Sequence, residues 1–228
     1  MNGLPPGVLA GKKRDPYWSS VTSLVHFDGA NGATTVTDQK GNTWTFNPTA
    51  KLTTANKMFG TASLDAAAGT ATASIYTAAS LGNFGLRDFT LECWVKSSST
   101  GLYNMIFDKY SGLNDGFQLY FNASGYLVLY AATELGSATT GKVNDNQWHA
   151  VAVTRSGTTW RVFVDGVIVL TLTGISLNCN NTQNTYLCSQ GSTGPKYPMV
   201  GYLDEFRITD GVCRYTTNYT PSGPFPNN

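Results

Sequence analysis

The sequence predicts an all-β protein built as a two-sheet antiparallel sandwich or jelly roll, on three observations. Aromatic residues, which favour strands, are frequent, with 12 Tyr, 11 Phe and 5 Trp among 228 residues. Short apolar segments follow one another, separated by turn residues at roughly 8–12-residue intervals. No window shows the 3.6-residue apolar period of a capped amphipathic helix.

The candidate strands are patterned at a period of two, which is typical of sheets. In chain order they cover residues 23–27, 43–46, 61–66, 70–77, 88–97, 103–110, 116–122, 125–132, 148–155, 159–166, 167–174, 184–189 and 200–209. The clearest is 88–97 (DFTLECWVKS), whose apolar residues share one face: Phe89, Leu91, Cys93 and Val95. This alternation predicts a half-buried strand whose other face, including Glu92, points to solvent.

Two turns and one central strand complete the predicted middle of the sheet. The Asp165-Gly166 pair predicts a two-residue hairpin between 159–166 and 167–174, and Ser124-Gly125 predicts a second hairpin. In 148–155 (WHAVAVTR) both alternating sets contain apolar residues. That strand should therefore be covered on both faces.

Residues 1–18 stand apart from the body, which we place at 19–228. They carry Pro5-Pro6, several glycines and a short basic run, with no periodicity, so they are expected to form an extended N-terminal arm. Such an arm is either a loose tail or a docking segment that orders against another subunit. On the docking interpretation the partner-binding residues are Pro5, Pro6, Lys12, Lys13, Arg14, Tyr17 and Trp18.

The charge balance argues against several classes of partner. The net charge is +1 and only 13% of residues are charged, so no strong field exists to attract nucleic acid or anionic lipid. The N-terminus lacks the apolar core of a signal peptide, and no apolar run approaches the roughly 20 residues of a membrane span. We expect synthesis in the cytoplasm. Cys179 and Cys188 could form a disulfide or remain thiols, and the sequence leaves both open.

Catalytic patterns are missing from the sequence, which predicts that the protein is not an enzyme. A retaining glycoside hydrolase needs two carboxyl groups about 5 Å apart. Strand 88–97 offers only Glu92, and Glu occurs elsewhere only at 134 and 205. His26 and His149 lie in strand patterns, where a packing role is expected, since a general base also needs a nucleophile and an orienting group.

An ordered set of segments carries a family resemblance. The segments are SLVHFDGANGATTVTDQKGNTWTF, MFGTASLDAAAG, DFTLECWVKSSS, QWHAVAVTRSGTTWRVFVDGV and VGYLDEFRITDGVCRYTTNYTPSGPFP. Together they resemble the LamG-like, concanavalin A-like jelly-roll domain, in the form found in bacteriophage virion proteins. The resemblance covers about residues 20–226 and implies two face-to-face antiparallel sheets. The family includes lectins, glucanases and structural adhesion modules, so the fold leaves the function open.

The resemblance also implies candidate ligand sites, although no cofactor is required. Similar jelly rolls often hold one structural calcium ion where the first and last strands meet, and Asp28 and Asp204 match those places. Alternatively, Asp28 caps a turn and Asp204 pairs with an arginine. Sugar binding needs exposed aromatic rings beside polar groups. The candidates for sugar binding are Tyr103, Tyr110, Asn114, Asp115 and Tyr197. In the alternative interpretation, the tyrosines are packing residues.

The favoured function is that of a non-enzymatic bacteriophage structural protein. It would be a virion decoration or appendage, on the capsid or on a tail fibre. Its lectin-like body would be anchored to other virion proteins through the N-terminal arm, as a homo-oligomer on the particle. The alternative is a carbohydrate-binding module that attaches the phage to host surface glycans. Both functions can hold at once.

Overall fold

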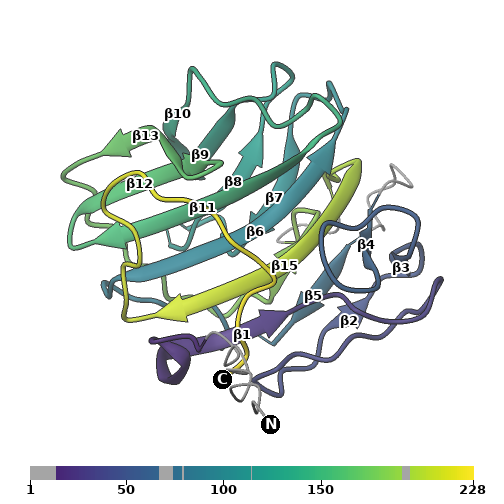
Figure 1. Ribbon diagram of the computed structural model, residues 1–228. Helices are drawn as coiled ribbons and strands as arrows, with labels where there is room; N and C mark the ends of the chain where they lie inside the picture. Colours follow the sequence, from purple (N-terminus) through teal and green to yellow (C-terminus); the bar gives the residue numbers. More distant parts are fainter. Residues whose placement is uncertain (1–13, 67–73, 79, 114, 192–195) are drawn as a thin grey trace, which may run out of the picture.

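Two antiparallel β-sheets lie face to face in the computed structural model, which describes residues 14–66, 74–78, 80–113, 115–191 and 196–228 (Figure 1). The predicted all-β sandwich is thereby confirmed. The described residues contain no α-helix, only one turn of 3₁₀-helix, η1 (Trp18–Ser20). In this part of the chain, no helix is long and apolar enough to cross a membrane.

Among the described residues, one sheet has eight strands and the other has seven. The eight-stranded sheet contains β1 (Val21–Val25), β3 (Lys51–Thr53), β4 (Ser63–Asp65), β6 (Phe89–Ser97), β11 (Trp148–Ser156), β12 (Thr159–Val164), β13 (Val167–Leu172) and β15 (Gly201–Asp210). The seven-stranded sheet contains β2 (Thr45–Phe46), β5 (Ile75–Thr77), β7 (Asn104–Asp108), β8 (Gln118–Phe121), β9 (Leu127–Ala131), β10 (Thr133–Ser137) and β14 (Thr185–Leu187).

The strand order shows which strands are central. The larger sheet runs β13-β12-β11-β6-β15-β4-β3, with β1 also pairing with β15, and the smaller runs β10-β9-β8-β7-β14-β5-β2. β11 lies between β12 and β6, and its residues 150–155 are buried. The prediction that this strand is covered on both faces is confirmed.

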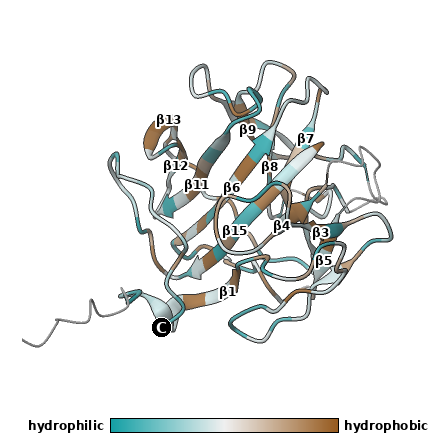
Figure 2. Ribbon diagram, turned by 45° about the vertical axis from the view of Figure 1, so that its right-hand side comes forward, coloured by the Kyte–Doolittle hydropathy of each residue, from teal (hydrophilic) through white to brown (hydrophobic). Residues whose placement is uncertain are grey.

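The core lies between the sheets and is filled by the inward-facing side chains of their strands. In Figure 2, hydrophobic and hydrophilic residues are mixed along the strands. Phe89 on β6 stacks on Phe117, which precedes β8, with ring centroids 5.5 Å apart. Trp160 on β12 meets both rings edge-on, at 5.1 and 5.2 Å. These rings connect the two sheets, and each buried phenylalanine contributes about 1.5–3 kcal/mol of transfer free energy.

Both predicted hairpins are present. Asp165 and Gly166 join β12 to β13 with φ angles of 50° and 76°. Two consecutive positive φ values match a type I′ turn, whose twist suits the flanking strands. Gly125, at φ 86°, lies in the turn between β8 and β9, and its N–H donates to the carbonyl of Asn122 at 2.8 Å.

Residues 14–20 and the C-terminal segment cover the outer face of the eight-stranded sheet, and this contradicts one prediction. Figure 1 shows the C-terminal segment crossing that sheet, and the Asp15 N–H donates to the carbonyl of Asn228 at 2.8 Å. Trp94 on β6 packs with Leu24 and Phe225 in a second apolar cluster. β6 is therefore buried on both faces, and the expectation that it would be half-buried was wrong.

The four cysteines are free thiols. Cys93, Cys179 and Cys188 are buried, and Cys213 is partly exposed. Burial raises the pKa of the Cys179 thiol to about 12 and raises that of Cys188 further, so neither forms a reactive thiolate at neutral pH.

Candidate functional site

The outer face of the seven-stranded sheet carries a second set of aromatic residues. On β8, Leu119 and Phe121 point into the core, while Tyr120 points outward because successive strand residues alternate. Tyr120 packs there with Met105 of β7 and Val128 of β9, in a small cluster separate from the main core. The face opposite the chain ends is thus apolar at its centre.

A groove of about 330 Å³ lies over this cluster. It has the size of a small-molecule site. Its lining is formed by Tyr103, Met105, Tyr110, Gln118, Tyr120, Tyr130, Gln190, Lys196 and Tyr197. Five of these nine residues are tyrosines, so the groove offers both aromatic faces and hydroxyl groups.

The tyrosines form two edge-to-face groups. Tyr103 contacts Tyr120 with centroids 5.4 Å apart and contacts Tyr197 at 4.9 Å. Tyr110 and Tyr130 form the other pair, at 5.6 Å. Tyr103 and Tyr197 are 44% and 45% exposed, whereas Tyr120 and Tyr110 are only 6% and 9% exposed. Two rings therefore stand at the rim, above a tyrosine floor.

Backbone hydrogen bonds hold Gln190, Lys196 and Tyr197 in place. The Met105 N–H donates to the Tyr197 carbonyl at 3.2 Å, which ties Tyr197 to β7. Gln190 and Lys196 exchange two N–H to carbonyl bonds of 2.8 and 3.0 Å, which places the two residues opposite each other. Lys196 and Tyr197 are thus positioned beside β7 by backbone hydrogen bonds.

A buried carboxylate supports the floor. Asp108 on β7 is 1% exposed. Its Oδ1 accepts from the Gln118 side chain at 3.0 Å and from the Tyr110 N–H at 3.1 Å, and its Oδ2 accepts from the Gly191 N–H at 2.7 Å. Burial raises the pKa of Asp108, and these hydrogen bonds partly offset that rise. The carboxylate thereby orients the Gln118 side chain in the floor of the groove.

The structure brings together three of the five residues predicted for sugar binding, namely Tyr103, Tyr110 and Tyr197. Asp115 does not line the groove; its side chain accepts a hydrogen bond from Ser111. Asn114 lies outside the described residues.

Tyr120, Tyr130 and Lys196, which the sequence offers as further candidates, also line the groove. The remaining three lining residues were not predicted, namely Met105, Gln118 and Gln190. Tyr120 and Phe121 face opposite ways, as alternation along a strand requires. Alternation does not indicate which of the two faces is covered.

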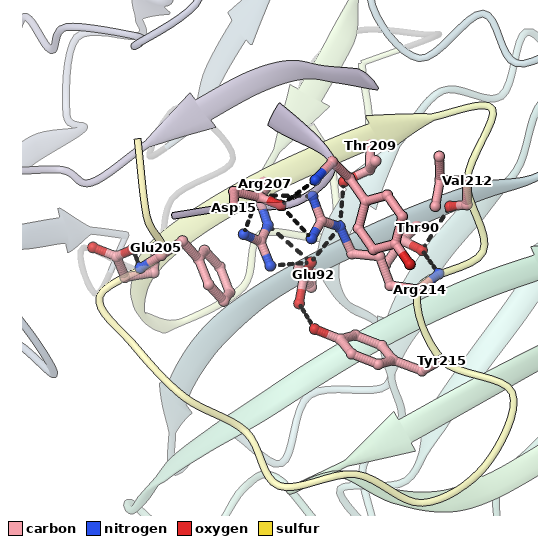
Figure 3. A network of polar contacts seen from close by, with 11 residues as sticks. Asp15, Thr90, Glu92, Glu205, Arg207, Thr209, Val212, Arg214 and Tyr215 are labelled. Carbon is pink, nitrogen blue, oxygen red and sulfur yellow. Dashed lines mark hydrogen bonds and ion pairs between the residues drawn. The ribbon is translucent and has the colours of Figure 1, made fainter. Parts of the chain in front are cut away.

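On the opposite face, a buried ion network fastens the N-terminal segment (Figure 3). Arg207 of β15 donates from Nε and Nη2 to Oε1 of Glu92, at 2.9 and 2.8 Å, and from Nη1 to Asp15 at 2.9 Å. Arg214 donates twice to Asp15, at 2.9 and 2.8 Å. Burial acts to raise the pKa of Asp15, but the two arginines and the Tyr17 N–H lower it on balance.

This network changes two expectations. Glu92 was expected to point to solvent, yet it is 2% exposed and paired with Arg207. Asp15, within the predicted arm, is 6% exposed and packs against the body. Alternation along β6 shows that the strand has two faces, but it does not show that segments distant in the sequence cover one of them.

Part of the predicted docking arm also contacts the body. The Lys40 ammonium lies 4.3 Å from the Trp18 ring centroid, and the Arg214 guanidinium lies 5.1 Å from that of Tyr17. Tyr17 is still 41% exposed, and Arg14 is exposed. Pro5, Pro6, Lys12 and Lys13 lie outside the described residues, so the role of that segment stays a prediction.

The proposed calcium ligands do not fit a calcium cage. Oδ2 of Asp204 accepts the N–H groups of Met58 and Phe59, at 2.8 and 3.0 Å. Asp28 accepts from both the N–H and the hydroxyl of Thr61. Calcium needs six to eight oxygen ligands, whereas Asp204 already accepts three backbone N–H groups and Asp28 accepts two donors from Thr61. Among the described residues, no group of three His, Cys, Asp or Glu is placed to hold a metal.

A larger hollow beside Asp28 is a weaker candidate site. It measures about 510 Å³ and is lined by His26, Asp28, Gly60 and residues 222–228. His26 is already paired with Glu205, at 2.7 Å from Nδ1 to Oε1. One wall of this hollow is the C-terminal segment, whereas the floor of the tyrosine groove is built on strands β7, β8 and β9.

The acid pairs and the histidines in the described part of the chain have structural partners. Asp15 and Glu92 both contact Arg207, beneath the chain ends, so neither is poised over a substrate. His149 lies between Asp165, at 2.7 Å, and Asp145, at 2.9 Å. A general base needs a reacting group on one of its nitrogens, but carboxylates occupy both.

The comparisons with known proteins agree with this architecture. A family model described as the concanavalin A-like lectin/glucanases superfamily matches residues 68–214, and the chain belongs to this superfamily. Its fold is accordingly lectin-like. A search of curated protein sequences finds no significant match.

Several solved structures share the fold at low sequence identity. The binding domain of Paraclostridial Mosquitocidal Protein 1 has a TM-score of 0.66 at 11% identity, over 86% of this chain and 50% of that one. Domain 4 of AbnA, an extracellular arabinanase from Geobacillus stearothermophilus solved with arabinotriose, has a TM-score of 0.62 at 18% identity, over 85% and 94%. The binding domain of botulinum neurotoxin serotype D has a TM-score of 0.62 at 11% identity, over 86% and 49%.

These neighbours differ in how much of their length is matched. The chain spans about half the length of the toxin binding domains and nearly all of the arabinanase domain. Identities this low show a common fold only. Two of these structures are described as binding domains, and the third is described as one domain of an arabinanase.

Proposed function

We propose that this protein is a non-enzymatic module that binds carbohydrate in the tyrosine-lined groove of its seven-stranded sheet. The observation that carries this proposal is the groove itself, where two half-exposed rings stand over a tyrosine floor. Sugars present flat apolar faces bordered by hydroxyls, so aromatic rings with adjacent amides match them chemically. The arabinanase domain solved with arabinotriose lends support, because it has the same fold.

The absence of catalysis is part of the same proposal. The described carboxylates that lie near one another are buried in ion pairs or take part in hydrogen bonds away from the groove. Hydrolysis of a glycosidic bond would require two carboxyl groups facing the same sugar. Incubation with the bound glycan should therefore release no reducing sugar.

Rim substitutions test the binding site. Tyr197→Ala should weaken binding of glycans identified on an array by at least about 10-fold, which corresponds to about 1.4 kcal/mol. Because Tyr197 is 45% exposed, its loss should leave the fold intact. Tyr76→Ala is the matched control, since Tyr76 belongs to a tyrosine pair with Tyr186 on the same sheet, outside the groove. Equal losses in both variants, or silence of the array, would disprove the proposal.

We also propose that the module is an appendage of a bacteriophage virion, made in the host cytoplasm and anchored through its N-terminal arm. The support is the resemblance to phage virion proteins, together with the position of the chain ends. Residues 14–20 and the C-terminal segment cover the outer face of the eight-stranded sheet, which the C-terminal segment crosses in Figure 1, whereas the groove lies on the opposite sheet. An anchored domain would thus present its groove outward.

Truncation tests the anchoring role. Removing residues 1–13 leaves Asp15 and its ion pairs in place, so the truncated protein should fold with an unchanged melting temperature. The truncated protein should fail to join phage particles when it replaces the full chain during assembly. Normal incorporation of the truncated protein would refute the anchoring role while leaving glycan binding untouched.

A further inference from the structure

We infer that the groove selects acidic glycans, in which a sugar carboxylate pairs with Lys196. This inference rests on the proposed carbohydrate-binding function and adds the chemical class of the ligand. It starts from the charges around the groove. Of the nine described lining residues, Lys196 is the only one that carries a formal charge; the others are tyrosines, glutamines and one methionine.

The position of Lys196 suits a role in recognition. Its backbone is held by the two hydrogen bonds to Gln190, and it directly precedes Tyr197, a rim ring. The side chain is exposed, so a bound sugar can reach the ammonium. A carboxylate placed there would receive a charge-assisted hydrogen bond, while the Tyr197 ring covers the sugar face.

The acids near the groove do not cancel this charge. Asp108 is 1% exposed, accepts three hydrogen bonds and has Lys109 as a close positive neighbour. Glu134 lies on β10, directly opposite Tyr130 of β9, so it points to the same face as the groove but does not line it. Its charge acts on Tyr120. Among the described lining residues, the accessible formal charge is therefore the positive charge of Lys196.

Two matched pairs of sugars test the inference. Trigalacturonic acid and its methyl ester share one sugar backbone and differ in the charge of the carboxyl groups and in the added methyl groups, and sialyllactose and lactose differ by one acidic sugar. Titration calorimetry on the full chain should show at least one acidic sugar binding about 5- to 10-fold more tightly than its neutral partner. This range lies between the strength of an exposed ion pair and that of a desolvated charged hydrogen bond.

Substitutions assign the effect to one side chain. Lys196→Gln should remove the preference for the acidic sugar and leave the affinity for the neutral partner within about twofold. Glu134→Gln should leave the preference unchanged or raise it. Lys51→Gln, an exposed lysine of β3 on the other sheet, is the control and should change nothing. Salt at about 0.5 M should weaken binding of the acidic sugar alone.

The outcomes separate the two proposals. If each neutral sugar binds as tightly as its acidic partner, or if Lys196→Gln weakens both equally, the acidic preference is wrong and carbohydrate binding stands. If no sugar in these pairs or on a broad array binds, carbohydrate binding fails and the acidic preference fails with it.

Discussion

Replacing Arg207 with methionine should destabilise the protein more than any surface change of equal size. Arg207 is 4% exposed and makes three charged hydrogen bonds, two to Glu92 and one to Asp15. Its guanidinium also lies 3.9 Å from the centroid of the Phe225 ring. The network contains two carboxylates and two guanidiniums, so its net charge is zero until one member is removed.

The magnitude follows from which bonds survive. In Arg207→Met, Asp15 keeps both hydrogen bonds from Arg214, but Glu92 keeps only the Tyr215 hydroxyl at 3.0 Å and a 3.7 Å contact to Arg214. Glu92 then becomes an under-compensated buried charge. Breaking a buried pair from one side costs about 3–5 kcal/mol. For a chain of this size that should lower the melting temperature by roughly 6–20 °C.

Urea denaturation followed by near-ultraviolet circular dichroism measures this change, with two comparison proteins. Arg87 makes a similar two-bond contact to Asp210, but its side chain is 53% exposed, so Arg87→Met should cost only about 0–1 kcal/mol. The double variant Arg207→Met/Glu92→Met removes one charge of each sign and should be more stable than Arg207→Met alone. A loss below about 1 kcal/mol for Arg207→Met would refute the view that burial makes this network important.

Three further predictions concern pH, metal and the N-terminal segment. Hydrogen bonding to Asp165 and Asp145 raises the pKa of His149 above 6.5 despite its burial. Protonated His149 therefore stabilises the fold fully below pH 6.5, and this stabilisation is lost as pH rises through the raised pKa. In His149→Gln the fall in melting temperature over that pH range should flatten, and an unchanged profile would contradict this. Burial raises the pKa of Asp204 to about 7 and its oxygens accept amide hydrogen bonds, so neither calcium nor a chelator should shift the melting temperature by more than about 1 °C. Asp15→Asn should make the peptide bonds around residue 15 cleavable by protease before the body unfolds, and cleavage only at global unfolding would count against it.

Local pattern was enough to predict the sheets and their inward faces. Alternation correctly assigned Phe89, Leu91 and Val95 to the core, because a strand must place successive side chains on opposite faces. The Asp165-Gly166 hairpin was equally predictable, since few residue pairs tolerate two positive φ angles. Both conclusions depend on residues that are neighbours in the sequence.

The burial of Glu92 could not be predicted in the same way. Its partner Arg207 lies 115 residues away, and Asp15 and Arg214 are separated by 199 residues. Alternation placed Glu92 on the outer face correctly, yet that face is covered by segments without strand periodicity. Such segments contribute to the fold through specific pairing, which leaves no regular signal in the sequence.

The groove shows the same limit, with a functional consequence. Tyr103, Tyr120 and Tyr197 come from three separate segments, and only the strand order β8-β7 and the contact of Met105 with Tyr197 bring them together. Each tyrosine alone is indistinguishable from a packing residue. What makes them a candidate site is that the chain ends cover the opposite sheet and leave this face accessible. We therefore expect recognition by the groove to depend on Lys196 and Tyr197, whose exposed side chains can change without disturbing the core beneath.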